Sequence, residues 1–274
     1  MELLTLFAFV IVISFVLSII SRGKSPKKYT YTQVKETRTQ KQNTAVASVF
    51  YWRFSTGLTY ILAKFNTSAN QVTILSFLFA ILATLIFVVG DYPTIIWGGI
   101  LSLFLFILDM VDGEIARLKG EASTFGLWVD HIFGEASQIL VYVGIALGIL
   151  LTNTNLQNVL LIVVFLLGCV MNYSVFIETR GLLEEYPKQV LEGKLANASR
   201  ILGVKPSDLS LTGDIVATLI LIFAVVNQLN FLVLFLAVVF NIQWVLAFIL
   251  IYRQKAKGND KQTRASLNAQ PSAS

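Results

Sequence analysis

The chain has 274 residues, of which 55% are hydrophobic and only 14% are charged. A soluble domain carries about 25% charged residues, so this composition excludes a disordered chain and argues strongly against a soluble globular protein. The length suits six or seven membrane-spanning helices, because each needs about 20 apolar residues. A single cysteine, Cys169, and a single histidine, His131, exclude an intramolecular disulfide and a zinc site built from Cys or His.

Seven apolar segments have the length expected of membrane-spanning helices. The first lacks a preceding Lys or Arg and an evident cleavage site, which favours a retained helix over a cleaved signal peptide. The stretch between the first two segments becomes amphipathic and aromatic near Trp52, as is typical of a helix in the headgroup region. In chain order the seven segments are 3–20, 72–89, 94–116, 126–151, 158–177, 211–226 and 231–252.

These features predict an all-α integral membrane protein with a six-helix transmembrane core, an additional N-terminal transmembrane helix and an interfacial amphipathic helix. The polar residues of the loop 179–210 favour a short surface helix, and the polar tail is expected to be disordered. The expected parts are an N-terminal helix at 1–21, a basic linker with the interfacial helix at 22–70, the core at 71–253 and the cytoplasmic tail at 254–274.

The positive residues fall on alternate loops. Of the 21 Lys and Arg, every one lies in 22–64, 117–119, 180–205 or 253–264, and the other three loops contain none. The positive-inside rule assigns the charged loops to the cytoplasm, which places the N-terminus outside and the C-terminus inside. The net charge of +5 is then a topology signal, and no nucleic-acid partner is needed to explain it.

Three aspartates interrupt the apolar segments, where ionisable groups are costly and usually functional. Asp109 and Asp112 are three residues apart, so they share a helix face. Asp130 lies on the next helix, and the short turn between the two helices makes them antiparallel neighbours. Three carboxylates with no deep basic partner suit Mg²⁺ or Mn²⁺, which shares its ligand shell with substrate phosphates. Arg117 adds a fixed positive charge suited to phosphate.

The pattern Asp109-x2-Asp112-Gly113-x2-Ala116-Arg117-x8-Gly126-x3-Asp130 resembles the signature of the CDP-alcohol phosphatidyltransferase family. Upstream, residues 67–73 look like the Thr-Pro-Asn-x-x-Thr segment of that family, although the proline is missing. An interfacial helix followed by six spans is also the layout of the family. The resemblance covers about residues 46–252.

The resemblance implies a transferase that moves a phosphatidyl-type group from a CDP-linked lipid or alcohol donor to a small alcohol or phosphorylated-alcohol acceptor, releasing CMP in phospholipid synthesis. Members of the family are often homodimers, so a homodimer is one expected partner arrangement. The distribution of Lys and Arg places the three aspartates near the cytoplasmic edge, so the active site is expected to face the cytoplasm. The residues carried over are three metal ligands (Asp109, Asp112 and Asp130, for two ions) and six residues that would line the nucleotide site (Gly113, Ala116, Arg117, Gly126, Asn70 and Thr73).

The sequence departs from the family pattern at position 134, where the expected final aspartate is a glycine. Glu135 is adjacent, but on a helix it is rotated by about 100° from position 134. His131 is the other candidate base, because its ordinary pKa suits proton transfer. A buried pair formed by His131 and Glu135, four residues apart, is the structural alternative.

Several functions stay open at this point. The chain is an active transferase with a rearranged base, or a catalytically impaired member that binds a CDP-linked ligand as a regulatory or structural subunit. A different magnesium-dependent membrane enzyme, such as an intramembrane prenyltransferase, is a weaker alternative. A transporter is weaker still, because the acids gather near one membrane edge and form no midplane site between repeats.

Overall fold

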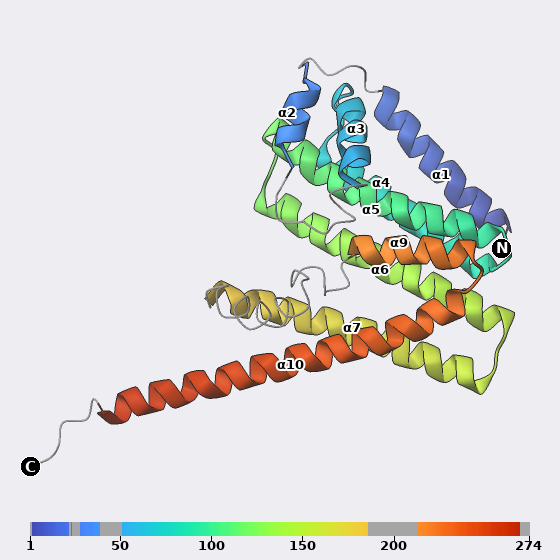
Figure 1. The fold of residues 1–274 in the computed structure, drawn as a ribbon. Helices are drawn as coiled ribbons and strands as arrows, with labels where there is room; N and C mark the ends of the chain where they lie inside the picture. Colours follow the sequence, from blue (N-terminus) through green and yellow to red (C-terminus); the bar gives the residue numbers. More distant parts are fainter. Residues whose placement is uncertain (1, 22, 24–27, 39–50, 186–212, 269–274) are drawn as a thin grey trace, which may run out of the picture. The chain divides into compact units, whose positions relative to one another are not determined.

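The structure is a computed structural model that describes residues 2–21, 23, 28–38, 51–185 and 213–268 (Figure 1). These residues form nine α-helices and no β-strand. The helices are α1 (Glu2–Ser21), α2 (Tyr31–Glu36), α3 (Trp52–Ala63), α4 (Ala69–Val89), α5 (Thr94–Lys119), α6 (Thr124–Thr152), α7 (Leu156–Glu185), α9 (Gly213–Val225) and α10 (Leu229–Asn268).

The prediction of an all-α chain is confirmed, with five helices long and apolar enough to cross a membrane: α4, α5, α6, Leu156–Val175 of α7 and Leu229–Leu246 of α10. The described apolar part of α1 is shorter, at Ala8–Ser21. Helix α9 has 13 residues and is therefore about 20 Å long, less than the roughly 30 Å of a hydrocarbon core. The count of seven spans stays a prediction. The predicted surface helix in 179–210 falls largely outside the described residues.

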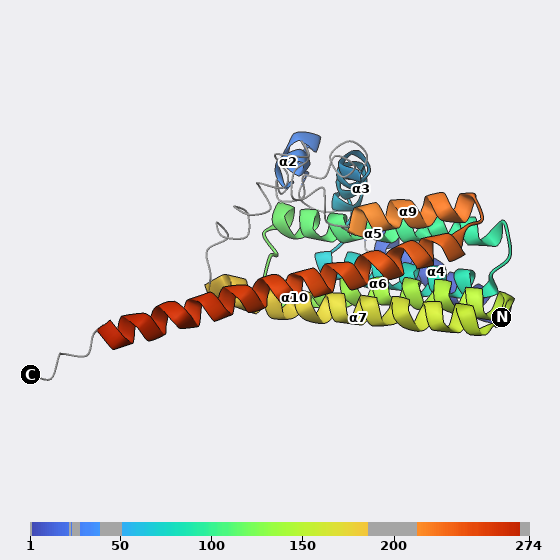
Figure 2. The same ribbon diagram turned by 60° about the horizontal axis from the view of Figure 1, so that its bottom comes forward.

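The chain forms two compact units. The first contains α1 to α6 and α9, and its helices α2 and α3 pack together against α5 while α9 runs along α5 (Figures 1 and 2). The second contains most of α7 and α10. Within the second unit, the Asn241 side-chain amide donates to the backbone oxygen of Val164 at 3.0 Å, and Asn172 donates to Gln243 at 2.9 Å. Amide bonds of this kind join helices in an apolar medium.

Helix α4 holds α5 and α6, which contact each other only slightly. Two glycines of α6 allow a close approach to α4. A Cβ at Gly144 would lie 2.7 Å from the Cα of Thr84, and one at Gly148 would overlap the carbonyl oxygen of Phe87. Small residues four apart are a common means of tight helix packing in membranes. The expectation that α5 and α6 are direct neighbours is therefore wrong for most of their length, because the glycines place α6 on α4.

Short polar motifs fix the helix ends near the three aspartates of the first unit. Ser68 begins α4 with a capping box that includes Gln71. Helix α5 ends at Gly120, whose left-handed conformation (φ 70°) suits glycine. Ser123 then begins α6 by accepting a hydrogen bond from the backbone N–H of Gly126. The start of α4, the end of α5 and the start of α6 are therefore fixed by local hydrogen bonds close in sequence to the aspartates.

Helix α3 buries polar side chains and exposes apolar ones. Ser55, Thr56 and Thr59 are fully buried, whereas Phe54 and Ile61 are 54% and 52% exposed. A helix on a water-facing surface shows the reverse pattern. Exposed apolar side chains suit contact with lipid, which supports the predicted interfacial helix.

The tail differs from the sequence-based expectation. Residues 254–268, expected to be disordered, continue helix α10 to Asn268. Lys, Gln, Arg and Ala in this stretch have high helix propensity, and they extend a helix that already exists, so no new nucleation step is required. The expectation of a disordered tail is therefore wrong for this segment, while 269–274 lie outside the described residues.

Candidate active site

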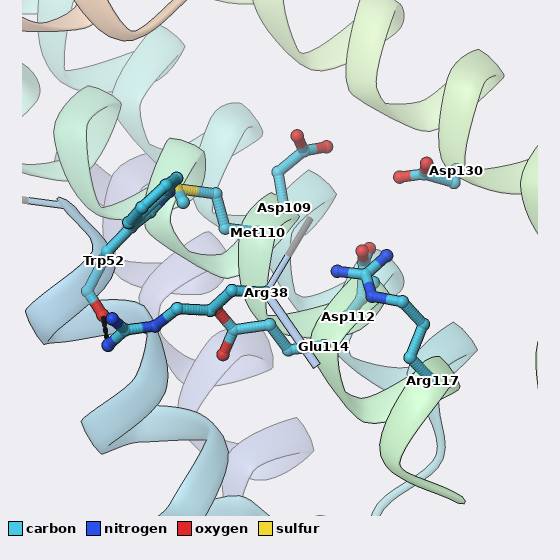
Figure 3. Close-up of a pocket in the computed structure, with 9 residues that line it drawn as sticks. Arg38, Trp52, Asp109, Met110, Asp112, Glu114, Arg117 and Asp130 are labelled. Atoms are coloured by element: carbon cyan, nitrogen blue, oxygen red, sulfur yellow. Dashed lines mark hydrogen bonds between the residues drawn. The ribbon is translucent and has the colours of Figure 1, made fainter. Parts of the chain in front are cut away.

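Three aspartates from two helices converge in the first unit (Figure 3). Asp109 and Asp112 project from α5 and Asp130 from α6, and one carboxylate oxygen of each lies within 4.8 Å of the others. Asp112 is buried, and the other two are half-buried. The spacing of the acids in the sequence predicts this convergence. Carboxylates this close repel one another unless a proton or a cation compensates them.

Thr73 of α4 holds one of these carboxylates. Its hydroxyl donates to Oδ2 of Asp112 at 2.6 Å, and both side chains are buried. A hydrogen bond to a candidate metal ligand fixes the direction in which the second oxygen points. Thr73, predicted to line the nucleotide site, therefore also orients Asp112.

Position 134 faces the acid cluster. A Cβ built at Gly134 would lie 3.1 Å from Oδ1 of Asp109, so a side chain here would enter the site. Glu135 is half-buried, and its charge acts on Asp109. His131 is exposed and does not line the pocket described below. Glu135 is therefore linked to the acid cluster through its charge, and neither Glu135 nor His131 is among the residues that line the pocket.

The small residues of the motif lie where helices and side chains approach closely. A Cβ at Gly126 would be 3.9 Å from Oδ1 of Asn70, which brings the α4 segment next to the start of α6. A Cβ at Gly113 would lie 3.1 Å from a guanidinium nitrogen of Arg117. Ala116 is half-buried, and its spacing from Asp112 and Gly113 places it on their helix face.

A pocket of about 130 Å³ adjoins the aspartates and extends toward α3 (Figure 3). Its lining includes four residues that sequence reasoning did not select: Arg38, Trp52, Met110 and Glu114. For two of them a signal exists in the sequence, since Met110 and Glu114 share a helix face with Arg117. Nothing in the sequence connects Arg38 with this site.

Glu114 joins the site to α3. It is buried, and its two carboxylate oxygens accept hydrogen bonds from Ser55 at 2.9 Å and Thr59 at 2.7 Å. Arg117, one turn further along α5, donates to the backbone oxygen of Thr37 at 2.7 Å. The segment before the core therefore forms one wall of the pocket, held by polar contacts to α5.

The family model for CDP-alcohol phosphatidyltransferases matches residues 66–249, more than half of the chain. The chain belongs to the CDP-alcohol phosphatidyltransferase family. The resemblance inferred from the signature is confirmed, and the five long apolar helices are those of an integral membrane protein. This family membership removes the support for a prenyltransferase or a transporter.

Two curated relatives resemble part of this CDP-alcohol phosphatidyltransferase family member. The archaetidylinositol phosphate synthase of Pyrococcus horikoshii is 38% identical over 87 residues, 32% of this chain and 45% of that protein. The bifunctional IPC transferase and DIPP synthase of Aquifex aeolicus is 36% identical over 73 residues, 27% of this chain and 16% of that protein. The chain thus spans less than half the length of the curated relatives that it matches.

The carboxylate ligands of this family member fit a divalent cation. CDP-alcohol phosphatidyltransferases depend on divalent metal, and the cluster of Asp109, Asp112 and Asp130 offers three carboxylates within binding distance of one another. Hard oxygen ligands are those that Mg²⁺ and Mn²⁺ prefer. Three carboxylate ligands also leave coordination positions of such an ion open for phosphate oxygens.

Proposed function

We propose that the protein is a membrane transferase that moves a phosphatidyl-type group from a CDP-linked donor to an alcohol, releasing CMP, in phospholipid synthesis. The observation that carries the proposal is the convergence of three carboxylates from α5 and α6 in a pocket that also contains arginine. The family to which the chain belongs supports the reaction class.

Each part of the site has a role in this reaction. Asp109, Asp112 and Asp130 would hold two ions of Mg²⁺ or Mn²⁺, with Thr73 fixing the orientation of Asp112. When bound, the metal would offset the negative charge that develops on the transferred phosphoryl group. Arg117 would bind phosphate oxygens of the donor, and the remaining motif residues (Gly113, Ala116, Gly126 and Asn70) would accommodate the nucleotide.

The proton of the acceptor hydroxyl needs a destination. The acceptor oxygen forms a bond to the donor phosphorus that carries the donor's own lipid alcohol. The bond between that phosphorus and the oxygen of CMP breaks, and the proton of the acceptor hydroxyl must leave. Gly134 offers no group, so we propose Glu135, whose charge reaches Asp109, as the base. Loss of a general base typically lowers the rate by about 10²–10⁴. Glu135→Gln should show a loss of that size, whereas Glu121→Gln, in the exposed turn before α6, should not.

A second function is favoured by the same glycine: a family member that binds a CDP-linked ligand with little turnover. It predicts metal-dependent CDP binding without CMP release, and activity gained by Gly134→Asp. The new side chain would require Asp109 to shift slightly, because the Cβ would lie 3.1 Å from Oδ1. Activity lost in Glu135→Gln, with no gain in Gly134→Asp, would support Glu135 as the base instead.

The decisive assay uses the purified full-length chain with labelled CDP-diacylglycerol or CDP-archaeol, Mg²⁺ or Mn²⁺, and a panel of acceptors. The panel includes inositol, inositol phosphate, glycerol and glycerol phosphate, because one similar protein is named an archaetidylinositol phosphate synthase. Absence of CMP release in every combination would overturn the transferase proposal. Asp112→Asn should abolish metal-dependent nucleotide binding, whereas Asp91→Asn, in an exposed loop, should leave it intact.

We also propose that the active site faces the cytoplasm, with the N-terminus outside and the C-terminus inside. The distribution of Lys and Arg supports this orientation. Cysteines introduced at Lys119 and Asn153 of a Cys169→Ser variant should react with impermeant maleimide from opposite sides of sealed vesicles. The reversed labelling pattern would contradict the proposed topology.

A further inference from the structure

Arg38 lines the pocket from outside the segment that matches the family model. That segment begins at residue 66, whereas Arg38 follows α2 and lines the pocket beside Trp52 and Glu114 (Figure 3). Two arginines, Arg38 and Arg117, thus line a cavity that also contains the three aspartates.

The orientation of Arg38 is fixed by neutral groups. Its Nε donates to the hydroxyl of Thr56 at 2.8 Å, and one terminal nitrogen donates to the backbone oxygen of Trp52 at 2.9 Å. The guanidinium carbon lies 5.7 Å from the centre of the Trp52 ring, within the range of a cation–π contact. Since both acceptors are uncharged, these bonds position the guanidinium without neutralising it.

Glu114, a carboxylate of the same lining, is hydrogen-bonded to other side chains. The two oxygens of Glu114 accept hydrogen bonds from the hydroxyls of Ser55 and Thr59. The charge of Arg38 acts on Glu114, but the Arg38 nitrogens donate their hydrogen bonds to the neutral oxygens of Thr56 and Trp52. A pre-oriented guanidinium that retains donors suits a bidentate contact with phosphate oxygens.

We propose that Arg38 binds phosphate oxygens of a substrate on the α3 side of the pocket, as a residue that sets substrate affinity. The inference rests on the proposed transferase function. The phosphate belongs either to the diphosphate of the CDP-linked donor or to a phosphate monoester on the acceptor alcohol. The two sources share one chemistry and differ in which substrate loses affinity when Arg38 is changed.

The test measures binding, so that it does not depend on turnover. The full-length chain in lipid nanodiscs is titrated calorimetrically, with Mg²⁺ present, with CDP, glycerol 3-phosphate, inositol 1-phosphate and the unphosphorylated alcohols. The variants are Arg38→Gln, Arg38→Lys and the matched control Arg53→Gln. Arg53 is an exposed arginine on α3 that does not line the pocket, so its replacement removes the same charge from the same region.

Loss of a charge-assisted hydrogen bond should weaken a phosphate ligand by about tenfold or more. We expect Arg38→Gln to lower the affinity for CDP or for the phosphate monoesters, with partial recovery in Arg38→Lys and no change in Arg53→Gln. Weaker CDP binding assigns Arg38 to the donor, and weaker monoester binding assigns it to the acceptor.

A separate variant controls for the anchoring of α3. Thr56→Val removes one support of Arg38 but leaves its charge, so it should weaken phosphate binding less than Arg38→Gln does. The proposal is overturned if the wild-type protein binds none of the phosphate ligands, or if Arg38→Gln and Arg53→Gln bind them equally. Normal binding effects together with no CMP release would instead refute the transferase function while leaving the assignment of Arg38 in place.

Discussion

The hydrogen bond between Thr73 and Asp112 yields the sharpest quantitative prediction. Thr73→Val keeps the shape of the side chain and removes the hydroxyl that donates to Oδ2 at 2.6 Å. Because both side chains are buried, water cannot readily replace the lost donor. A hydrogen bond to a charged group contributes about 1.5–3 kcal/mol, and loss of such support for a metal ligand typically costs about 10- to 100-fold in metal affinity.

The assay is CDP binding measured over a range of Mg²⁺ concentrations. We expect the Mg²⁺ midpoint of Thr73→Val to rise at least about tenfold, and Thr73→Ser to restore it. Thr84→Val is the matched control, since Thr84 also lies on α4 but donates to the backbone oxygen of Ala80 within its own helix. An unchanged midpoint in Thr73→Val would refute the reasoning, because it would mean that Asp112 needs no support to act on the metal.

Three further predictions concern the scaffold. Gly148→Val should lower the melting temperature and weaken CDP binding, because its Cβ would overlap the Phe87 carbonyl. The control is Gly57→Ala, whose Cβ meets no atom within 4 Å and which should be neutral or stabilise α3 by about 0.5–1 kcal/mol. Equal melting temperatures of the two variants would contradict the packing of α6 on α4. Glu114→Leu should destabilise the fold by about 1–3 kcal/mol for each buried hydroxyl left unpaired; an unaltered unfolding curve would mean that α3 is held by other contacts. Asn241→Leu should cost only about 0.6 kcal/mol, and a loss of several kcal/mol in thermal unfolding would mean that this amide holds α7 and α10 together more strongly than expected.

The sequence predicts the aspartate cluster well because its geometry is local. Asp109 and Asp112 are one helical turn apart, and a short turn returns the chain to Asp130, so few long-range details matter. The family signature places Gly113, Ala116 and Gly126 in the same short stretch of chain. The vacancy at position 134 is also visible in the sequence, and the structure adds that this position faces Asp109.

The α3 wall of the pocket could not be predicted in this way. Arg38 reaches the site through tertiary contacts with Thr56 and Trp52, and no periodic pattern records such contacts. The role of α4 between α5 and α6 depends on the backbone approach at Gly144 and Gly148, which an apolar pattern does not reveal. The polar composition of residues 254–268 favours disorder, whereas their helix propensity allows α10 to continue to Asn268.

The reversed polarity of α3 has a consequence for handling the protein. Its buried hydroxyls bind Glu114, while Phe54 and Ile61 face outward. The outward apolar side chains of this helix are stable in contact with lipid tails and unfavourable in contact with water. Solubilisation in a small, highly charged detergent should therefore loosen α3 before the other helices. Because α3 supplies a wall of the pocket, we expect ligand affinity to depend on the annular lipid and to recover on reconstitution into bilayers.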